Sequence, residues 1–340
     1  MMIPYPLCNN THSDQTFFMG KFNTFISTYP DAASAFFDKS NRVHSKMQTC
    51  THNPHVTHKT INHELYHNKN NVLYIFPNLT LDQPITLSTV FSQYRDTHTL
   101  IIIVDRNTSV SIHDMVADAP IARHIQYWVH ENAHLRLFYV QNGLSSTHNQ
   151  TIACYADTYS TINIQSLIAG ELLSKTFLSL YMYGMHAQAH ISGAIILKDT
   201  HNNSVSLYQK HLAPRTTSHA AIRGIIRNNA QLSYNGLIVI DSEATNSEAT
   251  QENKNILLDS GARAESIPSL EILTNEVQCA HGSAVSYLDP EQLFYAQSRG
   301  LDPDISRRIL IESFAYELFE KNAYSPPCSP LLEHLQALLS

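Results

Sequence analysis

The 340-residue sequence has few charged residues and few glycines. Lys, Arg, Asp and Glu together make up 15% of the chain, hydrophobic residues make up 43%, and there are 10 glycines. This composition excludes an intrinsically disordered protein and indicates a globular one with a large core. The formal net charge is −7 and no basic stripe is present, so we do not expect nucleic acid to be the main partner.

Cysteine is also scarce, and long apolar runs are missing. No CxxC pair occurs, which excludes a disulfide framework and a Cys-rich zinc box and favours a reducing cytoplasm. No run reaches the roughly 18 apolar residues of a membrane-spanning helix. Residues 1–15 lack the basic and apolar segments of a signal peptide. We therefore expect a cytoplasmic protein without a membrane partner; its five cysteines are Cys8, Cys50, Cys154, Cys279 and Cys328.

The motifs of common enzyme classes are absent as well. The sequence has no GxxxxGK[ST] loop to hold phosphates, so we expect no ATP site on this chain. It has no recognisable Ser–His–Asp arrangement and no pattern of paired carboxylates. These absences favour a protein that is not an enzyme.

One motif of a metalloenzyme is present, at residues 63–67, which spell HELYH. A zinc protease would place His63 and His67 on one helical turn as ligands, with Glu64 as the general base. Such a site needs a third ligand, but the next Glu is Glu131 and an Asn-rich turn follows the motif directly. In a chain with 20 histidines we interpret the pentapeptide as a coincidence and assign no metal to it.

Residues 1–70 and residues 71–288 differ in pattern. In the first segment Phe17, Phe18, Phe22 and Phe25 recur at helical spacing, which predicts a helical N-terminal region. In the second, short apolar and β-branched runs are bounded by Asn, Asp, Gly or Ser, which is typical of strands joined by turns. No amphipathic helices alternate with them, so a doubly wound sheet is not expected, and a sandwich, a barrel or a β-solenoid remains. The runs cover residues 72–76, 100–104, 110–112, 124–129, 135–140, 161–168, 176–183, 191–197, 205–207, 221–226 and 237–240.

The C-terminal region, residues 289–340, has the signals of helices. Asp289 and Pro290 suit the start of one helix and Gly300 its end, and Asp302–Pro303 repeats the start for a second helix that extends to about residue 321. The second helix has two apolar stripes, whereas a helix on its own domain's surface needs one. Either one stripe contacts the body and the other a partner, or the second stripe packs in a helical hairpin with the neighbouring helix. The two stripes are Ile305, Ile309, Tyr316 and Phe319, and Leu310, Ile311, Phe314 and Leu318.

Cys279 and His281 are the candidate ligands. With Val277 they occupy alternate positions, so in a strand all three side chains point to one face. Thiolate and imidazole both bind iron and iron–sulfur clusters. Two ligands do not complete a cluster site, so any cluster bound here is transient or shared with another chain. Shortly before them, Pro268 predicts the start of a strand at residues 269–273.

Three segments carry a resemblance to a known family. LLDSGARAESIPSLEI, VQCAHGSAV and LDPEQLFYAQSRGL resemble the SufB/SufD scaffold proteins of the Suf iron–sulfur cluster assembly machinery, and the resemblance spans about residues 205–321. His281–Gly282 points to the SufD branch, because the SufB branch usually has His-Glu there. Residues 211–226 also match the family's H-x-x-P-x-T-x-S stretch, for which we expect a structural role. The resemblance implies a right-handed parallel β-helix core at residues 71–288, with helical regions at both ends.

The resemblance also implies partners. A SufD-like subunit would form a complex with a SufB-like subunit and a separate SufC-like ATPase. His281, with Cys279 beside it, would lie at the interface with SufB, where a transient cluster or iron is held together with a SufB cysteine. The ATPase would dock on the C-terminal helices, at Phe294, Tyr295, Arg299, Leu310, Phe314 and Leu318.

Two other functions remain open. A homodimer of this chain could act as a scaffold without SufB. A β-helix enzyme acting on polysaccharide is the second alternative, and it would need clustered carboxylates with Arg or Lys on one face. The acidic residues of this sequence fall mostly at turns and in the C-terminal helices, which argues against the enzyme.

Overall fold

The computed structural model describes residues 65–67, 72–87, 99–116, 121–142, 147–169 and 172–320. All of them belong to one compact unit, residues 64–340. The helical region expected at residues 1–70 and the end of the chain after residue 320 lie outside the described residues. Two helices follow the strands: α4 (Pro290–Ser298) and α5 (Pro303–Glu320). The strands are β1 (Leu65–His67), β2 (Val72–Ile75), β3 (Ile85–Thr86), β4 (Thr99–Val104), β5 (Ser109–Val116), β6 (Ile121–Val129), β7 (His134–Asn142), β8 (Thr147–Ala156), β9 (Thr161–Ala169), β10 (Leu173–Met182), β11 (Gln188–Leu197), β12 (Asn202–His211), β13 (Thr217–Ile226), β14 (Gln231–Ile240), β15 (Ser247–Leu257), β16 (Arg263–Ile272) and β17 (Val277–Tyr287).

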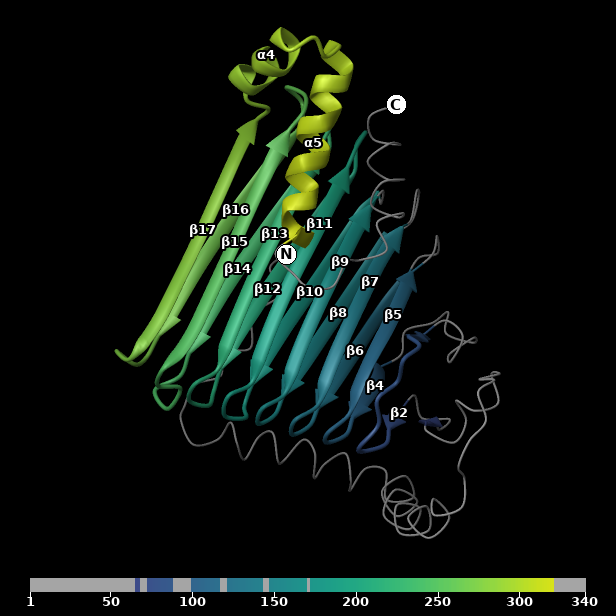
Figure 1. The fold of residues 1–340 in the computed structure, drawn as a ribbon, viewed down its shortest axis with the longest axis vertical. Coiled ribbons are helices and arrows are strands. Elements are labelled where there is room, and N and C mark those ends of the chain that lie inside the picture. Colours follow the sequence, from purple (N-terminus) through teal and green to yellow (C-terminus); the bar gives the residue numbers. More distant parts are fainter. Residues whose placement is uncertain are drawn as a thin grey trace. The chain divides into compact units, whose positions relative to one another are not determined.

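The strands form a parallel β-solenoid of about seven turns (Figure 1). The even-numbered strands from β2 to β16 make one sheet, with β1 added to its edge, and the odd-numbered strands from β3 to β17 make the other. Successive coils stack in register, so that Leu173, Asn202 and Gln231 are neighbours across three strands. The chain therefore alternates between the two sheets and advances by one strand in each sheet per turn.

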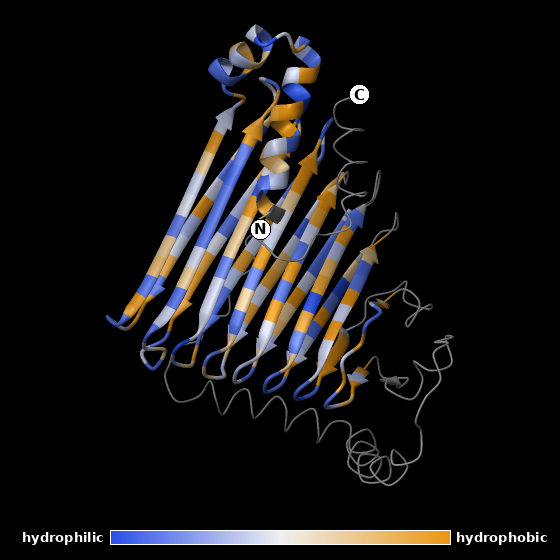
Figure 2. Ribbon diagram, viewed as in Figure 1, coloured by the Kyte–Doolittle hydropathy of each residue, from blue (hydrophilic) through white to orange (hydrophobic). Residues whose placement is uncertain are grey.

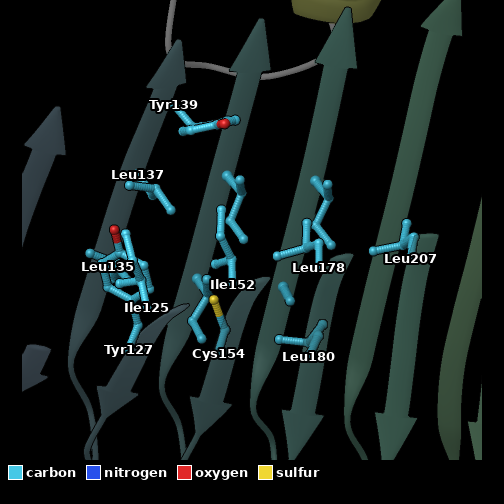
Figure 3. Close-up of a cluster of buried hydrophobic side chains, with 14 of the residues drawn as sticks. Ile125, Tyr127, Leu135, Leu137, Tyr139, Ile152, Cys154, Leu178, Leu180 and Leu207 are labelled. Carbon is cyan, nitrogen blue, oxygen red and sulfur yellow. The ribbon is translucent and has the colours of Figure 1, made fainter. Parts of the chain in front are cut away.

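The space between the two sheets, which we call the lumen, holds the core. Hydrophobic and hydrophilic residues alternate along many of the strands (Figure 2), because successive side chains of a strand point to opposite faces. The inward residues of the middle coils are large and apolar, as Figure 3 shows for the cluster around Ile125, Leu137 and Leu178. Complete burial of such a side chain stabilises the fold by about 1.5–3 kcal/mol, so stacked apolar rows hold the coils together.

Asparagine residues adopt the left-handed backbone conformation at several corners of the solenoid, a conformation that glycine usually takes. Asn78, Asn107 and Asn132 all have positive φ at successive corners of the solenoid. Asn tolerates this left-handed region better than most residues. The side-chain amides of these residues also form a ladder, with Nδ2 of Asn107 donating to Oδ1 of Asn78 at 2.9 Å and Nδ2 of Asn132 donating to Oδ1 of Asn107 at 2.8 Å. A turn-rich solenoid is thus built without many glycines.

Helix α4 begins and ends where the sequence predicts, and helix α5 begins where the sequence predicts. The side chain of Asp289 accepts a hydrogen bond from the backbone N–H of Glu291, Pro290 opens α4, and Gly300 follows with φ +91°. The side chain of Asp302 accepts from the N–H of Asp304 at the start of α5. Helix α5 then lies across β11 and β13 (Figure 1).

The solenoid confirms the predicted fold class, but some details of the strand prediction are wrong. The predicted runs do not include β3, β8 or β15, although the inward residues Ile152 and Cys154 of β8 are buried. Pro268 does not begin a strand; it lies within β16 (Arg263–Ile272). Proline removes a ladder donor and is therefore confined to edge strands, bulges and strand starts. Because β16 is the last strand of its sheet, the position tolerates it.

Candidate functional site

The two sheets of the solenoid end together at β16 and β17. Each of these strands has one neighbour in its sheet, β14 and β15 respectively. Most of their residues are half-buried or exposed, whereas the inward residues of earlier coils are buried. Among the described elements, none covers the lumen at this end. We call this the open end of the solenoid.

Cys279 and His281 face the lumen at the open end. Strand β17 pairs in register with β15, which places Cys279 beside Ala249 and His281 beside Gln251. Ala249 and Gln251 are buried inward residues, so their neighbours share the inward face. Cys279 packs with Val277 and Leu270 against a small apolar cluster, while His281 is exposed. The structure therefore brings the two predicted ligands together on one inward face, beside solvent.

The lumen changes in character beneath these two residues. The row that ends at His281 passes back through Gln251, Ala220, Ile191, Ile164 and Leu137. It is apolar in the early coils and becomes polar only at Gln251, which is 2% exposed. Burial of an amide is costly unless its hydrogen bonds are made. In this row, the polar residues therefore lie in the last coils, next to the candidate ligands.

A buried hydrogen-bond network accompanies this change. His211 contacts the hydroxyl of Thr216 through Nδ1 and that of Ser218 through Nε2, both at 2.7 Å. The side chain of Gln209 donates to Ser218 at 2.7 Å and accepts from Nε2 of Gln251 at 3.0 Å. His211, Pro214, Thr216 and Ser218 are the residues of the H-x-x-P-x-T-x-S stretch. The network supports the structural role expected for that stretch, because it joins the sheets across the lumen.

Burial affects the chemistry of the cysteine. It raises the pKa of the Cys279 thiol, so the thiol is protonated at neutral pH and becomes a thiolate ligand when a metal displaces its proton. Within the described residues, no group of three or more His, Cys, Asp or Glu side chains is arranged to hold a metal ion. Cys279 and His281 therefore fit an iron or cluster cargo only as part of a ligand set.

The residues predicted to bind an ATPase lie in different surroundings. Phe294 and Tyr295 are 73% and 61% exposed on α4. On α5, Leu318 is buried against the solenoid together with Ile311 and Ala315, and Phe314 is half-buried on the same cluster. Leu310 is half-buried, and Arg299 lies with its guanidinium 5.1 Å from the ring of Tyr295.

The two stripes of α5 differ only in part, because Tyr316 of the first stripe packs against the same buried cluster as the second. The stripe of Ile311, Phe314 and Leu318 contacts the chain's own body. Ile305 and Ile309, from the other stripe, are 50% and 42% exposed. Ile305 and Ile309 are thus the large apolar side chains that the described part of α5 leaves exposed.

The docking of α5 involves a residue that sequence reasoning missed. Arg223 of β13 is buried, its Nη2 lies 2.6 Å from a carboxylate oxygen of Glu252, and Glu317 of α5 is 3.8 Å away. Its guanidinium also lies 5.6 Å from the ring centre of Phe314. The available signal was an arginine within the apolar second half of β13, followed in register by Lys254 on the next coil.

The part of the HELYH motif that the structure describes is a strand and not a helix. His63 and Glu64 lie outside the described residues, but residues 65–67 form β1, which pairs antiparallel with β2. A zinc-protease motif needs its two His on a helix.

None of the helices in the described part of the chain is long and apolar enough to span a membrane.

Comparison with known proteins agrees with this architecture. Residues 90–314 match the family described as SUF system FeS cluster assembly, SufBD core domain. A SufBD family iron–sulfur cluster assembly protein of Mycobacterium leprae is 31% identical over 169 residues, which cover 47% of this chain and 43% of that protein. A SufBD family protein of Synechocystis is 32% identical over 125 residues, which cover 37% of this chain and 26% of the relative.

A third relative extends the match and shows its limit. A SufBD family protein of Mycobacterium tuberculosis is 24% identical over 207 residues, or 61% of this chain and 24% of its own length. The chain thus spans less than half the length of the curated relatives that it matches. The family match covers most of the solenoid, the open end and the two helices that follow it. The chain belongs to the SufBD family of iron–sulfur cluster assembly proteins.

Proposed function

We propose that this chain is a SufD-like scaffold subunit that helps to assemble iron–sulfur clusters together with a SufB-like subunit and a SufC-like ATPase. The observation that carries the proposal is the open end, where Cys279 and His281 share the inward face of the last strand. A thiolate and an imidazole are suitable ligands for iron or a nascent cluster. Two further ligands are needed, and a SufB-like partner that covers the open end would supply them.

The open end has the properties of a surface for such a partner. Strands β16 and β17 each present an edge without a neighbouring strand among the described residues, and such an edge can pair with a strand of another chain. Exposed apolar side chains lie on both strands or directly after them: Ile267, Ile272, Leu273, Val285 and Tyr287. Pairing of β17 with a strand of the partner would place Cys279 and His281 inside a continuous lumen.

Replacing His281 with Ala should greatly reduce cluster accumulation while the complex still assembles. His281 is exposed and its loss alters little packing, so its effect on stability should stay within about 0.5 kcal/mol. Loss of one ligand of a shared site, in contrast, removes a bond that no neighbouring group replaces. Cluster content is measured on the anaerobically purified complex from visible absorption and from iron per complex.

Cys279→Ser is the companion variant, and Ser283→Ala is the matched control on the same inward face. A Cys279 ligand predicts a loss as large as that of His281→Ala, whereas a packing role predicts a smaller loss. An assembled His281→Ala complex that accumulates clusters at the wild-type rate would exclude this residue as a ligand. If the purified chain forms the cluster without a SufB-like subunit, the homodimeric scaffold replaces the heteromeric one.

For the ATPase, we propose that the docking surface is formed by α4 and the exposed side of α5. Phe294 and Tyr295 on α4 and Ile305 and Ile309 on α5 are exposed apolar side chains, and clusters of that kind mark protein interfaces. Phe314 and Leu318 are then support residues, because they pack α5 on the solenoid, and Leu310 is half-buried beside them in the sequence of the helix. Arg299 would contribute from the end of α4.

Replacing both Ile305 and Ile309 with Asp should abolish co-purification of the ATPase without unfolding the chain. The two charges would enter an apolar interface, where burial of unpaired carboxylates is strongly unfavourable. Ser313→Ala is a control, because it changes an exposed polar side chain of α5 without adding a charge. Ile311→Asp should instead destabilise the docking of α5 itself, since Ile311 is fully buried. Retention of the ATPase by a folded Ile305→Asp, Ile309→Asp protein would contradict this surface.

A further inference from the structure

The side chain of Gln251 makes a hydrogen bond through its amide nitrogen, but its amide oxygen has no partner among the described residues. Its Nε2 donates to Oε1 of Gln209 at 3.0 Å, which fixes the amide and directs it across the lumen. Its Oε1 is buried and has no hydrogen-bond partner among the described residues. A buried acceptor without a donor destabilises a protein, because its lost hydration is not replaced. Retaining Gln251 at this position is therefore costly unless a donor reaches it.

The opposite sheet leaves room for this oxygen. A Cβ atom at Gly236 of β14 would lie 2.1 Å from Oε1 and 2.7 Å from Cδ of Gln251. Any residue larger than glycine at position 236 would therefore displace the amide. The lumen thus contains a glycine on one sheet that makes space for the glutamine of the other. Gly236 itself is buried, and its register partner on the last coil is Pro268, which has no N–H to donate.

His281 is the residue in position to donate. It is the register partner of Gln251 on the next strand and shares its inward face. Oε1 of glutamine and Nε2 of histidine are both four bonds from their Cα atoms, so the two side chains reach to similar depth. In-register neighbours of a sheet are about 4.8 Å apart, so a modest tilt of either side chain brings the two groups within hydrogen-bond distance.

We propose that Gln251 is a positioning residue for His281: its Oε1 accepts a hydrogen bond from one ring N–H and thereby orients the other ring nitrogen toward the cargo. The inference rests on the proposed ligand role of His281. Metal-binding histidines almost always donate their second ring N–H to a carbonyl, carboxylate or water, and loss of such a partner weakens metal affinity by about 10–100-fold. The amide oxygen of Gln251 provides that partner from within the chain.

The proposal predicts a spectroscopic signature in the full-length protein. With zinc bound, one ring nitrogen of His281 binds the metal and the other carries a proton. That proton should be protected from exchange by Gln251 and visible in a proton–nitrogen spectrum of the histidine-labelled protein. His281→Gln identifies the signal by its loss. In Gln251→Met the signal should disappear, and the affinity for Co²⁺, followed through its visible absorption, should fall by about tenfold or more.

A matched pair of variants separates positioning from packing. Gln251→Met and Gln251→Glu both lose the donor to Gln209, but only Glu keeps an oxygen that can accept from His281. The glutamate variant should therefore retain the protected signal. If the glutamate variant does not fold, Gly236→Ala provides the second test. It keeps Gln251 but displaces its amide, and should therefore reproduce the effect of Gln251→Met. Gln150→Met removes a buried amide from a distant coil and should change neither signal nor affinity.

Two results would overturn the proposal. One is a folded Gln251→Met protein with an unchanged His281 signal and unchanged Co²⁺ affinity, which would make Gln251 a packing residue. The other is a wild-type protein that binds zinc through His281 without a protected ring proton. Failure of the ligand role is distinguishable from both, because the wild type would then bind Co²⁺ no better than the double variant Cys279→Ser, His281→Ala, and would also lack the protected signal.

Discussion

Replacing Asp114 with Leu should lower the free energy of unfolding by about 3–5 kcal/mol. Asp114 of β5 is 2% exposed, and its carboxylate lies 2.5 Å from Nη2 of Arg123 on β6, in the opposite sheet. Without Asp114, the guanidinium of Arg123 is left in the lumen with the side-chain oxygen of Gln150, at 3.3 Å, as its remaining hydrogen-bond acceptor among the described residues. A buried charge that has lost its counter-charge is strongly destabilising. Urea denaturation measures the change.

The double variant Asp114→Leu, Arg123→Met separates two causes of instability: loss of the ion pair itself, and burial of an arginine that has lost its counter-charge. Replacement of a buried pair by apolar residues of similar size is often neutral or stabilising. We therefore expect the double variant to recover most of the stability that the single variant loses. A single variant that loses less than about 1 kcal/mol, the range of a surface ion pair, would show that Arg123 reaches solvent, since its side chain is 18% exposed.

This ion pair also shows where sequence reasoning reached its limit. Asp114 follows Ile112 on a short run that predicts a strand, and Arg123 precedes another. Nothing in their spacing indicates that they meet, because the contact joins two sheets across the lumen. Local periodicity predicts strands, but the pairing of residues in opposite sheets depends on how each coil turns.

The open end was predictable in part. Alternation placed Cys279 and His281 on one face of a strand, and the structure has them there. That this face points into the lumen, and that Gln251 lies beneath His281, follows only from the register of β15 and β17. For Pro268, the local rule gave the wrong boundary. A proline usually marks a strand boundary, but an edge strand tolerates it in its interior.

Helix α5 illustrates a third case. Its two apolar stripes were visible in the sequence, but which stripe contacts the solenoid was not. The structure packs Ile311 and Leu318 on the solenoid and leaves Ile305 and Ile309 exposed. Arg307 also ties this helix to the solenoid, because its Nη2 donates to the backbone oxygen of Leu258 at 2.7 Å. Tertiary contacts therefore decide what amphipathicity leaves open.

Lowering the pH from about 7 to about 5 should destabilise the protein by about 2 kcal/mol through His211 alone. Burial lowers the pKa of His211 from 6.5 to about 4, and the neighbouring His219 contributes in the same direction. In the folded chain both ring nitrogens contact hydroxyls, and no carboxylate of the described residues pairs with the ring. Protonation is therefore unfavourable in the folded state and ordinary in the unfolded one.

The sign of the effect follows from proton binding. The folded pKa lies below the unfolded value, so the unfolded chain binds more protons between pH 6.5 and about pH 4, and stability falls as the pH falls through this window. His211→Gln removes the titrating group and keeps a polar side chain in the network. Its unfolding free energy should therefore change less over the same pH interval than that of the wild type, by about 2 kcal/mol. Burial also lowers the pKa values of His113, His190 and His201, but these act in both proteins and cancel in the difference. Equal pH dependence of the two proteins in urea denaturation would show that His211 is protonated in the fold, and that the lumen beneath the open end admits water.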